Sequence, residues 1–356
     1  MIQARLRKRF APSRESAEFT LDVEFRAGAG VTVLFGPSGA GKTLTLDCIA
    51  GFLRPDEGRL LLDDTLLFDA ASGVNLPPQR RQCGYVFQNY ALFPNMTLRE
   101  NLAFAADRRP RLERHRKVNE MIERFRLADV AGRRPHEVSG GQKQRCSIAR
   151  ALIGAPRLLL LDEPARGLDA VLRQELYEVL RQVRAEFSLP VLLVTHDLEE
   201  CFELGEEMLI LRDGRIVQSG APARILDQPA NLEVARLLGL FNLLPVEIKA
   251  LDPGAGTSQL KIDDAVLQGP YFPGRLRGDR LWLFIRPDQL RAYPHDGKAG
   301  ANRVAGSLVR ATERAQHVRL EFASGVAVHM PRQDFEPHKH NRDWLIEFPS
   351  QALRVL

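Results

Sequence analysis

The stretch Gly36-Pro37-Ser38-Gly39-Ala40-Gly41-Lys42-Thr43 decides the fold of this chain. It follows residues 30–35, a short run with β-branched side chains that predicts a strand. It leads into residues 42–50, whose apolar side chains recur at helical spacing. A glycine-rich turn between a strand and a helix is the phosphate-loop pattern. We therefore expect this turn to bind the phosphates of a nucleotide.

Each residue type in this turn is chemically suited to binding phosphate or Mg²⁺. Glycines let backbone N–H groups point at the phosphates, and the positive end of the following helix adds to the attraction. Lys42 supplies a positive charge to the β- and γ-phosphates, and the hydroxyl of Thr43 is a suitable ligand for Mg²⁺. The alternative is a glycine-rich turn that binds no ligand.

A second motif, Leu158-Leu-Leu-Leu-Asp162-Glu163-Pro164, ends an apolar run with two adjacent carboxylates. Asp162 is suited to hold Mg²⁺ through water, and Glu163 to orient and deprotonate an attacking water molecule. Adjacent acids at the end of a strand are common, so the pair alone is weak support for a site. Together with the phosphate loop upstream, it predicts a nucleotide-hydrolysing centre.

The segments around these motifs predict an α/β fold. Residues 157–162 and 190–195 are continuous apolar runs of strand length, as in parallel strands that are buried on both faces. Residues 141–152 and 168–188 have the apolar periodicity of helices. This alternation of strands and helices predicts a parallel sheet covered by helices on both faces.

Between the two motifs lies Val138-Ser139-Gly140-Gly141-Gln142. Two glycines after Ser139, followed by a predicted helix, would direct backbone N–H groups and a helix N-terminus at an anion. The alternative is an ordinary helix start in which Ser139 is the cap. The sequence pattern alone leaves both interpretations open.

Length and composition set wider bounds. A chain of 356 residues predicts two or three domains. The net charge of +5 is too small to indicate nucleic-acid binding, and the four cysteines form no CxxC pair that would suggest a zinc site. No apolar run approaches the roughly 20 residues of a membrane-spanning helix, so we expect a soluble, intracellular chain.

The character of the sequence changes after about residue 240. Turn clusters at 252–256 and 269–274 separate short strand-like runs, which predicts a small all-β barrel or sandwich of roughly 110 residues. The expected strands are 244–248, 258–262, 281–286, 305–310, 317–322, 326–329 and 344–348.

With these motifs the chain resembles an ATP-binding-cassette (ABC) ATPase, with Walker A at 36–43, the signature motif at 138–142 and Walker B at 158–162. The resemblance covers residues 1–235. It implies an ATPase that uses ATP and Mg²⁺, built on the P-loop NTPase fold.

The resemblance also implies a domain organisation. The cassette would combine a mixed sheet core with an α-helical subdomain at about 89–155. Residues 236–356 would form a small all-β regulatory domain of the TOBE type, an OB-like barrel.

The resemblance assigns further residues. Gln88 is similar to the Q-loop glutamine, which touches Mg²⁺ and communicates with a membrane partner, and His196 to the switch histidine near the γ-phosphate. Without the resemblance, both would be ordinary polar residues. Asp169 matches an aspartate at the dimer seam, and Phe10 is the candidate for stacking on adenine. The implied catalytic residues are Glu163, His196 and Gln88, and the implied Mg²⁺ ligands are Thr43, Gln88 and Asp162.

The family mechanism requires two subunits that enclose two ATP molecules head to tail. The resemblance implies that Ser139, Gly140, Gly141 and Gln142 of one subunit contact the nucleotide on the other. The chain departs from the family at two positions. Leu44 stands where Ser or Thr often follows the Mg²⁺-binding hydroxyl, and Arg166 places a bulky cation at the dimer seam.

Residues 77–97 resemble bacterial importer ATPases for molybdate, sulfate, iron(III), polyamines and sugars. In that class this stretch forms part of a cleft for a permease helix, and the apolar residues that we place there are Tyr90, Leu92, Phe93 and Met96. Ordinary core residues are the alternative. Residues 283–288 resemble a strand of the TOBE domains of this importer class, residues 301–309 resemble the start of a molybdate-binding TOBE repeat, and residues 67–78 resemble molybdate-type ATPases. Together they favour molybdate or a related oxyanion.

The resemblance implies a homodimer docked to two transmembrane permease subunits. A periplasmic substrate-binding protein would act indirectly, and no nucleic acid would be involved. The place of work would be the cytoplasmic face of the bacterial inner membrane, with the chain bound peripherally. One alternative is an importer ATPase for sulfate, iron(III), a polyamine or a sugar. The other is a soluble ABC ATPase without a role in transport.

Overall fold

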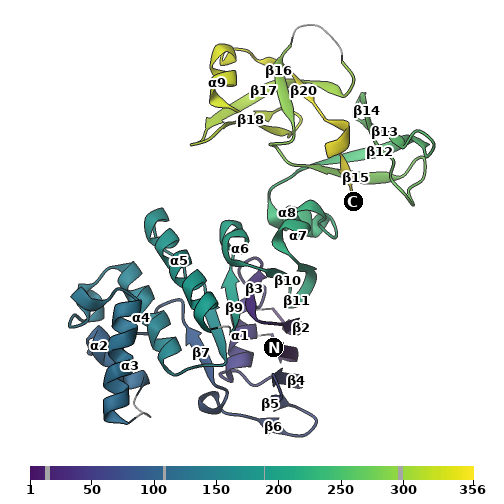
Figure 1. Ribbon diagram of the computed structural model, residues 1–356. Helices are drawn as coiled ribbons and strands as arrows, with labels where there is room; N and C mark the ends of the chain where they lie inside the picture. The colour runs from purple at the N-terminus through teal and green to yellow at the C-terminus, as the bar shows by residue number, and fades with distance from the viewer. Residues whose placement is uncertain (13–16, 107–109, 188, 296–299) are drawn as a thin grey trace. The chain divides into compact units, whose positions relative to one another are not determined.

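The structure is a computed structural model that describes residues 1–356 except 13–16, 107–109, 188 and 296–299. The chain forms two compact units, Met1–Gln228 and Pro229–Leu356 (Figure 1). The sequence placed this boundary between residues 235 and 236. Helix α8 (Leu232–Leu238) therefore belongs to the second unit, because its residues pack within that unit.

A six-stranded sheet forms the centre of the first unit. Its neighbouring strands β10, β3, β9, β8 and β7 run parallel, and β11 joins β10 antiparallel at one edge. Every residue of β8 and β9 is buried, which explains their continuous apolar sequences. In sheet order the strands are β11 (Arg215–Gly220), β10 (Glu207–Arg212), β3 (Gly30–Phe35), β9 (Pro190–Thr195), β8 (Leu158–Asp162) and β7 (Cys83–Val86).

A second, antiparallel sheet in this unit was not among the predicted elements. Its strand order is β2-β1-β4-β5-β6, and along β2 exposed residues alternate with buried ones. The buried side chains share one apolar core with the central sheet and with helix α1 (Lys42–Ala50), which follows the phosphate loop. The strands are β1 (Ile2–Phe10), β2 (Phe19–Ala27), β4 (Glu57–Leu62), β5 (Thr65–Asp69) and β6 (Val74–Asn75).

A helical part is inserted between β7 and β8, which confirms the expected helical subdomain (Figure 1). Two of its helices begin with a capping box, in which the cap side chain and the third helical residue bond to each other's backbone N–H groups. The boxes are formed by Thr97 with Glu100 and by Ser139 with Gln142. The helices are α2 (Leu98–Ala105), α3 (Arg111–Arg124) and α4 (Gly140–Ile153), with 3₁₀ turns at Ala128–Val130 and Pro135–Glu137.

The remaining helices of the first unit lie between or after the strands of the central sheet. They are α5 (Ala170–Phe187), α6 (Leu198–Leu204) and α7 (Pro222–Asp227), with a 3₁₀ turn at Pro78–Arg80.

One arginine in this unit is fully buried without an acidic partner. The guanidinium of Arg81 donates to the carbonyl oxygens of Cys48 (2.7 Å) and Ile49 (2.8 Å), in the last turn of α1. It also donates to the carbonyl of Leu76 and the side chain of Asn75. Burial lowers the pKa of this group. The negative C-terminal end of α1 is therefore the main stabiliser of its charge.

After α8 the second unit consists mainly of β-strands, which agrees with the β-rich domain that the sequence predicted. Two five-stranded antiparallel sheets share one apolar core, to which Ile248 and Leu283 contribute from one sheet and Trp344 and Ile346 from the other. The first sheet consists of β14 (Ala265–Pro270), β13 (Thr257–Ile262), β12 (Asn242–Asp252), β15 (Arg280–Ile285) and β21 (Arg354–Val355). The second consists of β16 (Arg291–Pro294), β20 (Asp343–Glu347), β17 (Arg303–Glu313), β18 (Val318–Phe322) and β19 (Ala327–Met330). The short helix α9 (Arg332–Phe335) and 3₁₀ turns at Glu336–His338 and Ser350–Ala352 complete it.

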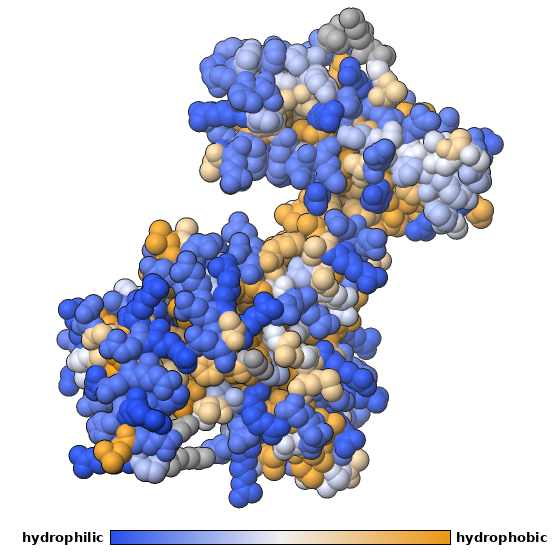
Figure 2. Space-filling view, viewed as in Figure 1, coloured by the Kyte–Doolittle hydropathy of each residue, from blue (hydrophilic) through white to orange (hydrophobic). Residues whose placement is uncertain are grey.

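The visible surface of each unit is mainly hydrophilic, with hydrophobic atoms gathered in small separate patches (Figure 2). Within the described parts of the chain, no helix is both long and apolar enough to cross a membrane.

Candidate nucleotide-binding site

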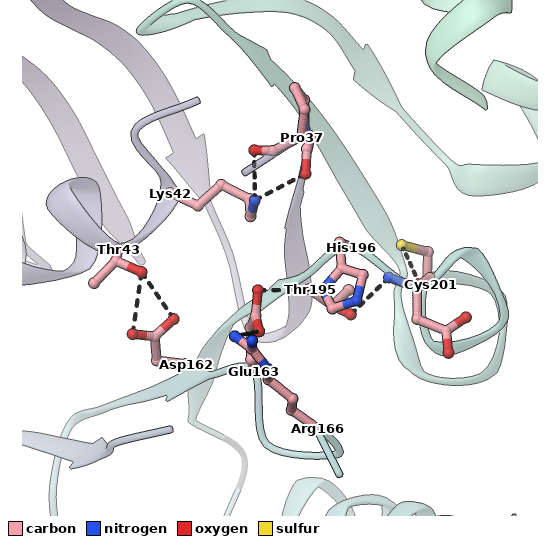
Figure 3. Close-up of polar contacts among 11 residues, drawn as sticks. Pro37, Lys42, Thr43, Asp162, Glu163, Arg166, Thr195, His196 and Cys201 are labelled. Carbon is pink, nitrogen blue, oxygen red and sulfur yellow. Dashed lines mark hydrogen bonds and ion pairs between the residues drawn. The ribbon is translucent and has the colours of Figure 1, made fainter. Parts of the chain in front are cut away.

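The topology of the central sheet brings the sequence motifs together. The phosphate loop follows β3, His196 follows β9, and Asp162 ends β8 with Glu163 directly after it. Gln88 comes two residues after the end of β7. These four strands are parallel neighbours in the sheet, so their carboxyl ends lie along one edge. Residues far apart in the sequence therefore converge on one site (Figure 3).

The phosphate loop closes around the ammonium group of Lys42. This group donates to the carbonyl oxygens of Gly36 (2.8 Å) and Pro37 (2.9 Å), as Figure 3 shows. The side chain is buried, and this burial lowers the pKa of Lys42, whereas the nearby carboxylates of Glu163 and Asp162 raise it. The loop thus holds a positive charge at its centre, as a site for phosphate requires.

Two glycines in the loop lie where a side chain is strongly disfavoured. Gly41 caps the start of α1 with φ of +101°, a conformation that side chains disfavour, and the space beside it is filled by Leu21 and Phe19. At Gly36 a side chain would collide with the backbone carbonyl of Leu211 on β10. The conformation of the loop therefore depends on these two residues.

Thr43 and Asp162 form the part of the site suited to Mg²⁺. The Thr43 hydroxyl lies 3.1 Å and 3.2 Å from the two carboxylate oxygens of Asp162. Asp162 is buried, which raises its pKa, while the hydrogen bond from Thr43 lowers it. A hydroxyl and a carboxylate at the mouth of a phosphate loop are hard oxygen donors of the kind that Mg²⁺ prefers, so the residues fit this ion.

Glu163 has an unusual backbone conformation, with φ of +46°. Its N–H donates to the carbonyl of Val194 on β9 (2.9 Å), which fixes the turn after β8. One carboxylate oxygen lies 3.2 Å from Nδ1 of His196, and the other accepts from the guanidinium of Arg166 (3.0 Å). Glu163 and His196, named separately from the sequence, are thus direct partners.

Gln88 contacts Arg166 in this structure, and its role as a Mg²⁺ ligand stays a prediction. No described hydrogen bond joins it to Thr43 or Asp162, the other two expected Mg²⁺ ligands. With its amide oxygen turned toward the donors around it, Gln88 accepts from Nη1 and from Nε (3.1 Å) of Arg166. Arg166, which the sequence marked only as a departure from the family, therefore joins two residues of the candidate site.

Phe19 places an aromatic ring beside the phosphate loop. Its ring lies 3.2 Å from the position that a Cβ atom on Gly41 would take. Phe10 packs against Phe19, and the centroids of the two rings are 6.1 Å apart. The sequence analysis named Phe10 and missed Phe19. The available signal was the alternation of apolar and polar residues that begins at Phe19 and continues along β2.

The residues of the signature motif begin helix α4. The Ser139 hydroxyl accepts from the N–H of Gln142 (3.3 Å), and the Gln142 side chain accepts from the N–H of Ser139 (2.9 Å). At Gly141 a side chain would meet Leu172 of α5 at 2.8 Å, so close packing requires glycine there. The capped helix start is therefore present, and no described contact joins it to the phosphate loop of the same chain.

Two other sequence positions have structural roles. Asp169 accepts from the N–H of Leu172 (2.9 Å) at the start of α5, and its residue is exposed. Leu44, the departure after Thr43, packs against the apolar core. Its side chain thus adds to the stability of α1, whereas a hydroxyl there would add a polar group.

The stretch after Gln88 presents apolar side chains at the surface. Phe93 is partly exposed, and its ring packs edge-on against the exposed Phe104, with centroids 4.8 Å apart. Phe104 and Met96 line a surface cavity of about 530 Å³. The backbone carbonyl of Tyr90 accepts from Ser147 (2.8 Å) on α4, so this stretch is fixed to the helical part.

Comparison with known proteins places these features in a family. Residues 20–166 match the family model described as "ABC transporter". A spermidine/putrescine import ATP-binding protein of Nitratidesulfovibrio vulgaris is 41% identical, over 77% of this chain and 73% of the relative. A molybdenum import ATP-binding protein of Rhodospirillum rubrum is 42% identical, over 61% of this chain and 58% of the relative. A molybdate/tungstate import ATP-binding protein of Archaeoglobus fulgidus is 43% identical, over 66% of this chain and 95% of the relative.

Solved structures agree with this assignment. The ATP-binding cassette MJ0796, in a dimeric post-hydrolysis state bound to ADP and Pi, has a TM-score of 0.54 and 27% identity, covering 62% of this chain and 99% of the cassette. The cbiO1 structure from Clostridium perfringens, at 24% identity and a TM-score of 0.55, shares the fold. The chain therefore belongs to the ABC transporter family of ATP-binding proteins, and it is an ATPase that uses ATP with Mg²⁺.

Proposed function

We propose that this ATPase is the energy-coupling subunit of a bacterial importer for molybdate or a related oxyanion. The observation that carries the proposal is the pair of sequence stretches, at 67–78 and 301–309, that resemble molybdate-type members, together with the stretch at 283–288 that resembles the regulatory domains of this importer class. Relatives named for molybdenum and for molybdate/tungstate import support it. The second candidate is polyamine import, because the relative named for spermidine/putrescine import is similar over a longer part of the chain.

The geometry of the site supports a role for each residue. Lys42 and the backbone of the loop bind the β- and γ-phosphates, and Glu163 accepts the proton of the attacking water. His196, in contact with Glu163, orients that carboxylate and the γ-phosphate. Mg²⁺, held by Thr43 and Asp162, supplies positive charge to the phosphate oxygens when it is bound. Gln88 can contact Mg²⁺ only after its amide group has released Arg166.

A homodimer completes the proposed site. Residues 139–142 form the capped start of α4 and have no described contact with the loop at 36–43. They are therefore available to a nucleotide bound by a second copy. A helix N-terminus attracts an anion, which suits the γ-phosphate. Asp169 lies exposed on the same turn as Arg166 and belongs to the proposed seam. Adenine would stack on Phe10 or on Phe19, which lies closer to the loop.

The partners outside the dimer follow from the importer proposal. Two transmembrane permease subunits would each dock one copy of the chain at the cytoplasmic face of the inner membrane. The exposed rings of Phe93 and Phe104, with the cavity beside Met96, offer an apolar surface for a permease helix. A periplasmic binding protein would deliver the substrate, and residues 236–356 would form the regulatory domain. Nucleic acid has no part in this function.

Uptake in cells tests the proposed substrate. In the host organism, deletion of the gene for this chain should abolish uptake of radioactive molybdate, and excess unlabelled tungstate should compete with it in the wild type. The wild-type gene should restore uptake, and Lys42→Ala, expressed at the same level, should not. Labelled spermidine is measured in parallel. Loss of spermidine uptake with molybdate uptake intact would favour the second candidate.

A further inference from the structure

Arg166 contacts two residues of the proposed catalytic set at once. Its Nη1 donates to a carboxylate oxygen of Glu163 (3.0 Å). With the Gln88 amide oriented so that its oxygen faces the donors around it, Nη1 and Nε (3.1 Å) of Arg166 also donate to that oxygen. Figure 3 shows its guanidinium against Glu163, on the side away from the phosphate loop. A fork of several donors can hold two acceptors in this way, whereas a hydroxyl cannot.

These contacts occupy the groups that hydrolysis needs. His196 contacts the first carboxylate oxygen of Glu163, and Arg166 takes the second through a charge-assisted hydrogen bond. An oxygen engaged by a cation is less available to accept a proton from water. The oxygen of Gln88, which in the proposed function turns toward Mg²⁺, is engaged by the same guanidinium.

The side chain of Arg166 is not needed to build the turn. The N–H of Arg166 donates to the carbonyl of Glu163 (3.2 Å), and the N–H of Leu168 to the carbonyl of Ala165 (3.2 Å). Backbone hydrogen bonds therefore close this segment. The side chain is 58% exposed, so solvent weakens its ion pair, and the guanidinium can leave without opening a core.

We propose that Arg166 is a positioning residue that restrains ATP hydrolysis: it ties the Glu163 carboxylate to the Gln88 amide and releases both when the second subunit closes on the nucleotide. The inference rests on the proposed roles of Glu163 and Gln88. It gives the departure at position 166 of the proposed seam a role, which is to slow basal ATP hydrolysis.

Steady-state kinetics of the purified full-length chain test the brake. Arg166→Ser should raise kcat for phosphate release about 3- to 5-fold, which corresponds to about 0.7 to 1 kcal/mol in the barrier. The KM for ATP should stay unchanged, because Arg166 does not contact the phosphate loop. Arg166→Lys keeps the positive charge but lacks the planar set of guanidinium N–H donors. Its kcat should therefore lie between those of the wild type and Arg166→Ser.

A matched control removes another exposed arginine from an ion pair outside the site. Arg181 bonds to Glu203 (2.6 Å) with both side chains 45% exposed, and Arg181→Ser should leave kcat unchanged. A kcat of Arg166→Ser at or below the wild-type value would overturn the proposal, as would an equal rise in Arg181→Ser. Glu163→Gln distinguishes a failure of the proposed role of Glu163 from a failure of the proposed role of Arg166. If it retains wild-type turnover, the proposed role of Glu163 fails, and if it is inactive while Arg166→Ser shows no rise, only the brake fails.

Discussion

Glu200 is a buried acid in the segment that follows His196. It lies in the first turn of α6, close to Asp197, and one of its carboxylate oxygens has no hydrogen-bond partner. The nearby hydroxyl of Tyr177 on α5 is also buried without a partner. Burial raises the pKa of Glu200 to about 7, although a hydrogen bond from Thr195 lowers it.

This pKa predicts a pH-dependent stability. An acid whose pKa is higher in the folded state binds its proton more tightly there, so the free energy of unfolding falls as pH rises from about 4.5 to about 7. Glu200→Gln cannot ionise and escapes this loss. Its free energy of unfolding relative to the wild type should increase by about 2 kcal/mol between pH 5 and pH 8. Urea unfolding followed by circular dichroism measures this difference, and a difference that does not change with pH would contradict the prediction.

The site illustrates how far single residues can be read from a sequence. The loop at 36–43, Asp162 and Glu163 were recognisable because local patterns specify them, and their strand ends place them together. The contact between Arg166 and Gln88 was not, because it joins residues from different loops and depends on where two long side chains point. A departure from a familiar motif was the only sign of it.

At the scale of elements, continuous apolar runs predicted the buried parallel strands β3, β8 and β9 with nearly their observed bounds. Strands β1 and β2 were missed. They carry charged residues on their exposed face, and β1 pairs with β4, about 50 residues away in the sequence. Alternation with so many charges resembles a surface segment until the partner strands are known.

The two capping boxes allow two roles of Ser139 to be measured separately: its role in ATP turnover and its role as a helix cap. Ser139→Ala and Thr97→Ala each remove a cap hydroxyl from a helix of the same subdomain, and each should cost about 1 kcal/mol of stability in urea unfolding. Only Ser139→Ala should also lower ATP turnover, because only α4 begins with the signature motif. Equal turnover in the two variants would reduce Ser139 to a structural cap.

At the scale of the whole molecule, the two units have separate apolar cores. The chain contains two tryptophans, Trp282 on β15 and Trp344 on β20, and both lie in the second unit. Tryptophan emission therefore reports on the second unit. The ellipticity at 222 nm reports mainly on the first, where α1 to α7 lie.

These two signals should respond differently to ATP. In Glu163→Gln, which we expect to bind without hydrolysis, ATP with Mg²⁺ at 100 times its Kd should stabilise the first unit by about 2.7 kcal/mol. The urea midpoint followed by circular dichroism should rise, and the midpoint followed by tryptophan emission should stay in place. A common shift of both midpoints would mean that the units unfold together.

The buried guanidinium of Arg81 has a consequence for hydrogen exchange. It binds the last turn of α1 and the segment at Asn75 and Leu76, so neither can open without leaving this buried cation short of two of its acceptors. The amides of these two segments should therefore exchange with solvent in one cooperative opening. Because α1 begins at Lys42 and the chain after Arg81 leads through β7 to Gln88, this opening would loosen the support of two segments of the candidate site.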